Sequence, residues 1–241
     1  MKEDSPGSKS MLVIKGSEVL SLLAGKEKEI VDTVRAAYLS HRKGNSSLPH
    51  STFLRFPFDK ASRIIALPAY LGDGAGTAGI KWISSFPANL DRGLDRASAV
   101  LVLNSVETGM PYALLEGSVI SAKRTAASAA LAATALRRTD KIQSVALLGC
   151  GLINFEVLRF LRSTFPGLTD LTIMDLSRER AKQFEDGCQR LFGCLSLRIA
   201  GDIDELLASA PLVVMATTAS RPHISNLAAC PRGTTILDIS L

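Results

Sequence analysis

Beyond residue 143 the sequence alternates short apolar stretches with amphipathic ones, and this rhythm restricts the fold more than any other feature. Helix-like stretches begin at Ile153, Ser177 and Asp202, between β-like stretches. Strands and helices that alternate at this length predict a parallel sheet covered by helices on both faces. We therefore expect an α/β protein with a doubly wound domain over residues 138–241. The β-like stretches are SVALLG, LTIMD, LSLRIA, LVVMAT and TTILDISL.

The first half of the chain has a different pattern. Two helix-like stretches, SEVLSLLAG and KEKEIVDTVRAAYLSHRKG, precede short β-like runs that are separated by turn residues. The runs TFLRF, RIIALPAYL, AGIKWISSF and SAVLVLNSV predict an antiparallel or mixed sheet, and SVISAKRTAASAALAATALRR predicts a long alanine-rich helix. We expect an N-terminal α+β domain over residues 1–137, with the boundary near RRTDKIQ.

Composition excludes several classes of protein. The net charge is +5, and the basic residues are scattered rather than interleaved with aromatics, so a nucleic-acid partner is not expected. The four cysteines form no CxxC pair and have no histidine at zinc spacing, which predicts reduced thiols in a cytoplasmic protein and no metal site. Residues 1–10 lack the apolar core of a secretory signal, and no apolar run reaches the roughly 20 residues of a membrane helix.

A glycine turn joins the first strand of the doubly wound domain to its first helix. Gly149 would allow the tight turn and Gly151 would let the backbone approach a diphosphate, which the N–H groups of the helix start would hold. Asp175, at the end of the next strand, would accept hydrogen bonds from the adenosine ribose. This Rossmann-type pattern predicts NAD in preference to NADP, because an acidic residue there disfavours a 2′-phosphate.

The glycine pattern leaves alternatives open. Asn154 occupies the third position of the fingerprint, where glycine or alanine is usual, so a plain strand-to-helix turn and an S-adenosylmethionine pocket both remain alternatives. Thr217, in VVMATTAS, follows a strand that we expect beside the first one. We predict that this residue lies on the nicotinamide side of the site.

Three basic residues are candidates for binding substrate. Lys123 and Arg124 are about 100° apart on the alanine-rich helix, so at least one can face the interior. Arg124 could grip a carboxylate in two places, or be a solvated helix arginine. Lys81 lies among apolar strand residues, so it is either a charge that protects the edge of a sheet or a residue of the functional site. The same two interpretations apply to Arg55 in TFLRF.

Three segments together resemble the ornithine cyclodeaminase and mu-crystallin family: AGIKWISSFP, ASAVLVLNSVETGMPYALLEGSVISAKRTAASAALAA and VALLGCG. The likeness runs from about residue 17 onward. RIIALPAYLG and GIKWISSFPANLDRGLDRASAVLVLN resemble the branch that makes 2,3-diaminopropionate for siderophores and peptide antibiotics by NAD-dependent oxidative hydrolysis of N-(2-amino-2-carboxyethyl)-L-glutamate. Ornithine cyclodeaminase, ketimine reductase and a non-catalytic crystallin-like NAD(P)-binding protein are the alternatives.

The resemblance implies a homodimeric NAD enzyme and assigns roles by position. Lys81 corresponds to the family's substrate lysine, which we also take as the catalytic candidate, and Arg124 to the arginine that binds the substrate α-carboxylate. Arg55 could add a third cationic contact for a substrate with three carboxylates. The dinucleotide contacts fall on Gly149, Gly151, Leu152, Ile153 and Asp175.

Two departures from the family pattern bear on activity. Cyclodeaminases carry a glutamate just before the proline of ALPAY, where this chain has Ile65 and Ala66, so ornithine cyclisation is disfavoured. The family's catalytic aspartate would lie beyond Leu241. We therefore expect a C-terminally truncated chain that lacks the usual acid/base residue and does not turn over by itself.

Overall fold

The computed structural model describes residues 11–74, 76–137, 141–193, 195–219, 221–222 and 224–240, and these fall into two compact units. The first unit comprises the described residues up to Gly25 together with Arg35–Ser121. The second comprises Lys26–Val34 and the described residues from Ala122 onward. Within these ranges, no helix combines the length and the apolar character that crossing a membrane requires.

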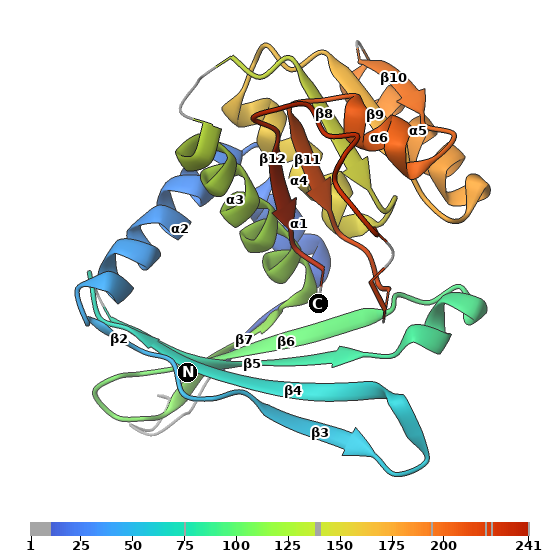
Figure 1. Cartoon of the computed structure of the whole chain (residues 1–241). Coiled ribbons are helices and arrows are strands. Elements are labelled where there is room, and N and C mark those ends of the chain that lie inside the picture. Colours follow the sequence, from blue (N-terminus) through green and yellow to red (C-terminus); the bar gives the residue numbers. More distant parts are fainter. Residues whose placement is uncertain are drawn as a thin grey trace. The chain divides into compact units, whose positions relative to one another are not determined.

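The first unit is built on a mixed, mainly antiparallel seven-stranded sheet (Figure 1). Its path runs β1-β7-β6-β5-β4-β2, and β3 pairs with β4 beside β2. The meander β4 to β7 is antiparallel, as the turn-separated runs predict, whereas β1 joins β7 in parallel. The strands are β1 (Leu12–Ile14), β2 (Ser46–Ser47), β3 (Thr52–Phe56), β4 (Asp59–Leu71), β5 (Thr77–Ser85), β6 (Ala97–Asn104) and β7 (Pro111–Glu116); helix α1 (Gly16–Leu23) and the 3₁₀ helix η1 (Pro87–Arg92) lie between them.

The two faces of this sheet carry different side chains because residues alternate along each strand. Lys81 pairs with Leu67 on β4 and Leu101 on β6, and the buried Ala99 and Ala113 belong to the same face. Trp82, one residue on, lies on the opposite face and is 42% exposed. One face of the sheet therefore bears Lys81 with the buried Ala99 and Ala113, and the other face bears the exposed Trp82.

The second unit contains the predicted doubly wound sheet. Its five strands are all parallel, in the order β10-β9-β8-β11-β12, so the order reverses between β8 and β11. In open α/β sheets, ligands bind outside the carboxyl ends of the strands at this reversal. The elements are β8 (Ser144–Leu148), α4 (Leu152–Thr164), β9 (Asp170–Met174), α5 (Arg178–Phe192), β10 (Ser196–Ile199), α6 (Ile203–Ala208), β11 (Leu212–Met215) and β12 (Thr235–Asp238).

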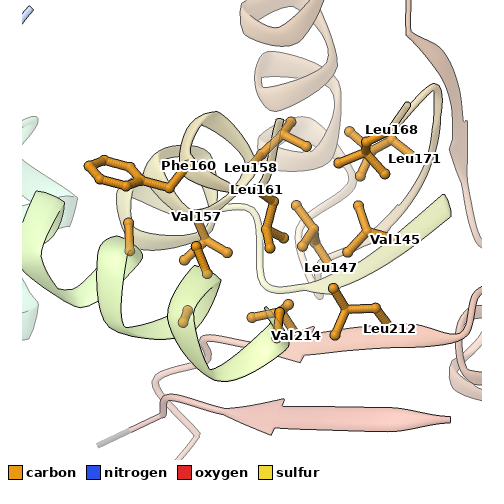
Figure 2. Packing of buried hydrophobic residues seen from close by; sticks show 14 of the residues in the cluster. Val145, Leu147, Val157, Leu158, Phe160, Leu161, Leu168, Leu171, Leu212 and Val214 are labelled. Atoms are coloured by element: carbon orange, nitrogen blue, oxygen red, sulfur yellow. The ribbon is translucent and has the colours of Figure 1, made fainter. Parts of the chain in front are cut away.

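Both faces of this sheet are buried, which explains why its strands are almost continuously apolar. One face packs against α3 (Ser118–Arg137), α4 and α5 through side chains such as Val145, Leu147 and Phe160 (Figure 2). The other face packs against α6 through Ala146 and Leu148. Packing on both faces thereby fixes the positions of the carboxyl ends of β8 and β9.

Helix α3 belongs largely to the second unit, although the sequence pattern placed the boundary at residue 137. Its buried alanines, among them Ala126, Ala130 and Ala133, are part of the core of the parallel sheet. Residues 26–34 at the start of α2 (Glu27–Arg42) pack with that core through Val31. The contacts therefore divide the chain inside two helices rather than at the turn after α3.

A buried ion pair joins α3 to α4. Lys123 is 6% exposed, and its Nζ lies 3.1 Å from Oε2 of Glu156. Oε1 of the same carboxylate lies 3.4 Å from Nε of Arg159, one turn further along α4. Because a buried charge that loses its partner costs about 3–5 kcal/mol, this pair fixes which face of α3 points inward. The adjacent Arg124 is left exposed.

Candidate functional site

The turn after β8 requires glycine at its first position. Gly149 has φ +94°, and a Cβ added there would lie 2.5 Å from the carbonyl oxygen of Ala216, which follows β11. Its N–H donates to the carbonyl of Met174 on β9 at 2.8 Å. The turn is therefore pressed between the ends of the two neighbouring strands, where only a residue without a side chain fits.

The peptide group between Gly149 and Cys150 is bonded to side chains through both its carbonyl and its N–H. The Nδ2 group of Asn154 donates to the Gly149 carbonyl at 2.7 Å and to the Leu148 carbonyl at 2.8 Å. The N–H of Cys150 donates to Oδ2 of Asp175 at 2.8 Å. Asn154 is fully buried, so the position that usually takes a small residue is filled here by an amide that stabilises the turn.

Gly151 immediately precedes α4 as its N-cap residue and leaves the start of this helix open. No side chain caps it, whereas Ser177 and Asp202 accept backbone N–H bonds at the starts of α5 and α6. A Cβ added to Gly151 would meet nothing within 4 Å. The first N–H groups of a helix lack intrahelical partners and carry partial positive charge, so this corner has the space and the polarity for an anion such as a diphosphate.

Two further candidates, Leu152 and Ile153, are the first residues of α4. The Leu152 side chain is exposed, and Ile153 is half-buried against the core. Their contribution to an anion site is the backbone N–H, which does not depend on the side chain. The predicted residues around the glycine turn are therefore together in the structure.

Asp175 lies directly after β9 with its carboxylate 10% exposed. Besides Cys150, it accepts a 2.9 Å hydrogen bond from the N–H of Ser177, and its Oδ1 lies 3.5 Å from Nε of Arg180. The next residue, Leu176, is 98% exposed. The carboxylate of Asp175 and the exposed apolar side chain of Leu176 are thus adjacent at the edge of the glycine turn.

Thr217 lies on the other side of the turn. Its Cγ2 would be 3.6 Å from a Cβ on Gly149, and its N–H donates to Oγ of Ser240 at 3.0 Å. A cavity of about 350 Å³ opens here at the carboxyl ends of β11 and β12. Its lining is formed by Met215, Thr217, Ala219, Arg221, Pro222, Ile224, Asp238 and Ser240.

The thiol in the glycine turn has no catalytic character. Burial raises the pKa of Cys150 to about 12, and the nearby charge of Asp175 adds to the shift. Since the thiolate is the reactive form of cysteine, Cys150 is inert at neutral pH. Among the described residues, no group of His, Cys, Asp and Glu side chains could hold a metal ion.

The two main substrate candidates lie in different units, Lys81 on β5 of the first and Arg124 on α3 of the second. Arg124 is exposed on this helix, and none of the described residues forms an ion pair with its guanidinium. Lys81, in the first unit, is half-buried, and its Nζ donates to Oγ of Ser121 at 2.9 Å. Ser121 belongs to the same helix, three residues before Arg124.

Arg55 is exposed on the outer strand β3, where its guanidinium lies 5.5 Å from the ring centre of Phe53. It pairs across the strands with Arg63 on β4. Sequence patterns gave no sign of this partner, nor of the role of Asn154, because both depend on contacts between separate elements.

Comparison with known proteins identifies the family. The model of the ornithine cyclodeaminase/mu-crystallin family matches residues 11–237. The chain belongs to this family. It is 28% identical to N-((2S)-2-amino-2-carboxyethyl)-L-glutamate dehydrogenase of Staphylococcus aureus, over 90% of this chain and 66% of that protein. It is 31% identical to alanine dehydrogenase of Archaeoglobus fulgidus, over 93% of this chain and 65% of that protein.

Solved structures of the family share this fold. Δ1-pyrroline-2-carboxylate reductase of Thermococcus litoralis, in complex with NADH and L-proline, superposes with a TM-score of 0.88 at 26% identity, covering 95% of this chain and 69% of that one. An archaeal alanine dehydrogenase dimer with bound NAD gives 0.81 at 27% identity, over 94% and 66%. The chain thus spans about two thirds of the length of these relatives.

The two glycines of the turn should respond differently to alanine. Gly149→Ala places a Cβ against the Ala216 carbonyl at an unfavourable φ, so we expect it to lower the free energy of unfolding by about 2 kcal/mol or more. Gly151→Ala meets open space and should cost only about 1 kcal/mol. Urea unfolding of the two variants measures the difference, and equal losses would contradict the proposed packing of Gly149.

Proposed function

We propose that the protein is an NAD-linked oxidoreductase acting on the carbon–nitrogen bond next to a carboxylate of an amino acid. The open helix start at Gly151, beside Asp175 and behind a turn that accepts only glycine, is the observation that carries this proposal. It fits a dinucleotide diphosphate because the space that a side chain would fill is empty. NAD or NADH is bound in the structures of the two relatives described above.

Each candidate cofactor-binding residue of the second unit has a task in this proposal. The N–H groups that begin α4 hold the diphosphate, and Asp175 accepts the ribose hydroxyls. Leu176 offers an apolar surface to the adenine, and Thr217 borders the cavity that would receive the nicotinamide end. When bound, the nicotinamide supplies a hydride acceptor.

For the substrate we propose N-(2-amino-2-carboxyethyl)-L-glutamate. Loss of hydride from its glutamyl α-carbon converts the secondary amine to an imine, and water cleaves this into 2,3-diaminopropionate and 2-oxoglutarate. Arg124 binds the α-carboxylate, and Lys81 holds a second carboxylate or polarises the region of the imine nitrogen. Two observations support this choice: the chain has Ile65 and Ala66 where cyclodeaminases of the family carry a glutamate, and it is similar to the Staphylococcus aureus enzyme.

The direct test is amine-dependent formation of NADH, followed by absorbance. We expect the whole protein to turn over N-(2-amino-2-carboxyethyl)-L-glutamate, with little activity on L-alanine, L-ornithine or L-proline. Faster turnover with L-alanine or L-proline would favour the activities named for the other relatives instead. Calorimetric binding of S-adenosylmethionine without binding of NAD would end the oxidoreductase proposal.

Arg124→Ala should separate substrate binding from cofactor binding. Loss of a charge-assisted bidentate contact predicts a fall in kcat/KM on the order of 10²-fold, with the NAD dissociation constant nearly unchanged. Arg190→Ala, which removes an exposed arginine near the end of α5, is the matched control. Equal kinetics for the two variants would show that Arg124 is a solvated surface residue.

Asp175→Ala should shift cofactor preference toward NADP. The substitution removes the ribose acceptor and releases Arg180, whose guanidinium could then meet a 2′-phosphate. Binding of NAD and NADP by fluorescence titration measures the ratio, with Glu179→Ala in the first turn of α5 as control. An unchanged ratio would mean that the ribose lies elsewhere.

We also propose that the protein forms a homodimer through the open face of the first unit's sheet. Trp82 pairs in register with Val100 on β6, and Leu54 on β3 and Val13 on β1 lie on the same face, all of them exposed. An exposed apolar surface on a sheet is typical of a subunit interface. The archaeal alanine dehydrogenase relative is described as a dimer.

Trp82→Arg should weaken this dimer because it places a charge in the apolar face. Light scattering over a dilution series should show monomer at higher protein concentrations than in the unsubstituted protein. Phe58→Arg, a change of the same kind at an 85% exposed residue in the β3–β4 turn, should leave the assembly unchanged. Identical behaviour of both variants would rule out this face.

A further inference from the structure

The ammonium group of Lys81 is bonded to a side chain on another element of the first unit. Its Nζ donates a 2.9 Å hydrogen bond to Oγ of Ser121, near the start of α3. Lys81 lies in the middle of β5, so this bond connects the sheet with the helix. Both residues are half-buried, where a hydrogen bond from a charged donor is stronger than in water.

The neighbouring strands restrict the aliphatic part of the Lys81 side chain. Leu67 on β4 and Leu101 on β6 pair in register with Lys81, and both are half-buried. Residues directly opposite each other on antiparallel strands have Cβ atoms within about 5.5 Å. The two leucines therefore flank the methylene groups of the lysine, and its charged end extends beyond them to a polar partner. The direction of the ammonium group thus depends on that partner.

The backbone before α3 is fixed to the same sheet. The N–H of Gly117 donates to the carbonyl of Ala99 on β6 at 2.8 Å. A Cβ added to Gly117 would lie 3.1–3.3 Å from atoms of Ala99 and Val100, so the chain is in close contact with the strand here. The N–H of Ser121 in turn donates to the Gly117 carbonyl at 2.9 Å. Ser121 therefore has a fixed position relative to β6.

The carboxylate of Glu116 stabilises the start of the helix. It accepts hydrogen bonds from the N–H of Ser118 at 2.6 Å and from the N–H of Val119 at 3.1 Å, and the Ser118 hydroxyl also donates to it. A negative group beside the first N–H groups of a helix is favourable. Because Glu116 is the last residue of β7, the start of α3 is attached to both β6 and β7.

We propose that Ser121 is a positioning residue for Lys81, whose ammonium group it holds in the orientation that binds the substrate. The inference rests on the proposed function, because it takes Lys81 as a substrate-binding residue. A lysine side chain is flexible, and the orientations that it gives up on binding cost entropy. A hydrogen bond that fixes the ammonium group before the substrate arrives removes part of this cost.

Ser121→Ala tests the proposal because it removes the hydroxyl and keeps the ammonium group. For the whole protein we expect kcat/KM for N-(2-amino-2-carboxyethyl)-L-glutamate to fall about tenfold. In a protein that already carries Lys81→Met, the further change Ser121→Ala should alter kcat/KM by less than about twofold. Equal losses in both backgrounds, or no loss in either, would overturn the positioning role.

Two control variants separate the hydroxyl from the fold of the helix. Ser121→Thr keeps a hydroxyl at the same position and should recover most of the kcat/KM that Ser121→Ala loses. Ser84→Ala removes a hydroxyl that bonds to Ser98 between β5 and β6, on the other face of the sheet, and should leave kcat/KM unchanged. Thermal unfolding shows whether each variant is folded. A folded Ser121→Thr variant that is no more active than Ser121→Ala would contradict the proposal.

Chemical labelling tests the same contact without turnover. Acetic anhydride modifies lysines, and mass spectrometry of the resulting peptides gives the rate at each one. We expect Ser121→Ala to raise the rate at Lys81 about threefold or more, because the amine loses a hydrogen bond, and the exposed Lys60 is the internal reference. An unchanged rate at Lys81 would overturn the proposal. If the whole protein oxidises no amine but the labelling difference is found, the redox proposal fails, while the positioning of the ammonium group by Ser121 stands.

Discussion

The candidate site depends on one peptide group held rigidly in place. The carbonyl of Gly149 receives the amide of Asn154, and the N–H of Cys150 is bound by Asp175. Any side chain at Gly149 would meet the Ala216 carbonyl, so the turn accepts only glycine at this position. Rotation of this peptide would turn the start of α4 away from the space above Gly151. The orientation of the helix N–H groups therefore depends on contacts from β9, α4 and the segment after β11.

The same contacts connect binding with stability. Asp175 would receive the ribose, but it also bonds the turn and the N–H of Ser177 at the start of α5. Lys123 and Glu156 link α3 to α4, so the helix that carries Arg124 is fastened to the helix that would hold the diphosphate. The residues proposed to bind substrate and cofactor thus lie on elements that are held by contacts outside the predicted site.

The elements of the fold could be predicted where their signal is local. The strand and helix alternation after residue 143 and the turns between β4, β5, β6 and β7 are visible in the sequence and are confirmed. The strand β1 was missed because three residues carry little pattern and pair with β7 about 100 positions away. The contact boundary inside α3 was missed because alanines do not show which sheet they pack against.

The residues of the candidate site likewise could be predicted where their position along one element decides, and not where contacts between distant elements decide. Gly149, Gly151 and Asp175 follow from their positions at the ends of predicted strands, and the structure places them together. The sequence indicated that Lys123 or Arg124 would face inward, but the partner that decides, Glu156, lies 33 residues away. The hydrogen bond between β5 and α3 joins positions 40 residues apart, and alternation within one strand gives no sign of it.

The neutral thiol of Cys150 has a consequence for the electrostatics of the turn. Because its pKa is raised to about 12, the side chain between the two glycines stays uncharged across the physiological range of pH. A thiolate at that point would repel a negatively charged phosphate group, and it would be open to oxidation by peroxide. Ionisation of this thiol should consequently add no pH dependence to the binding of an anion at this corner in the physiological range.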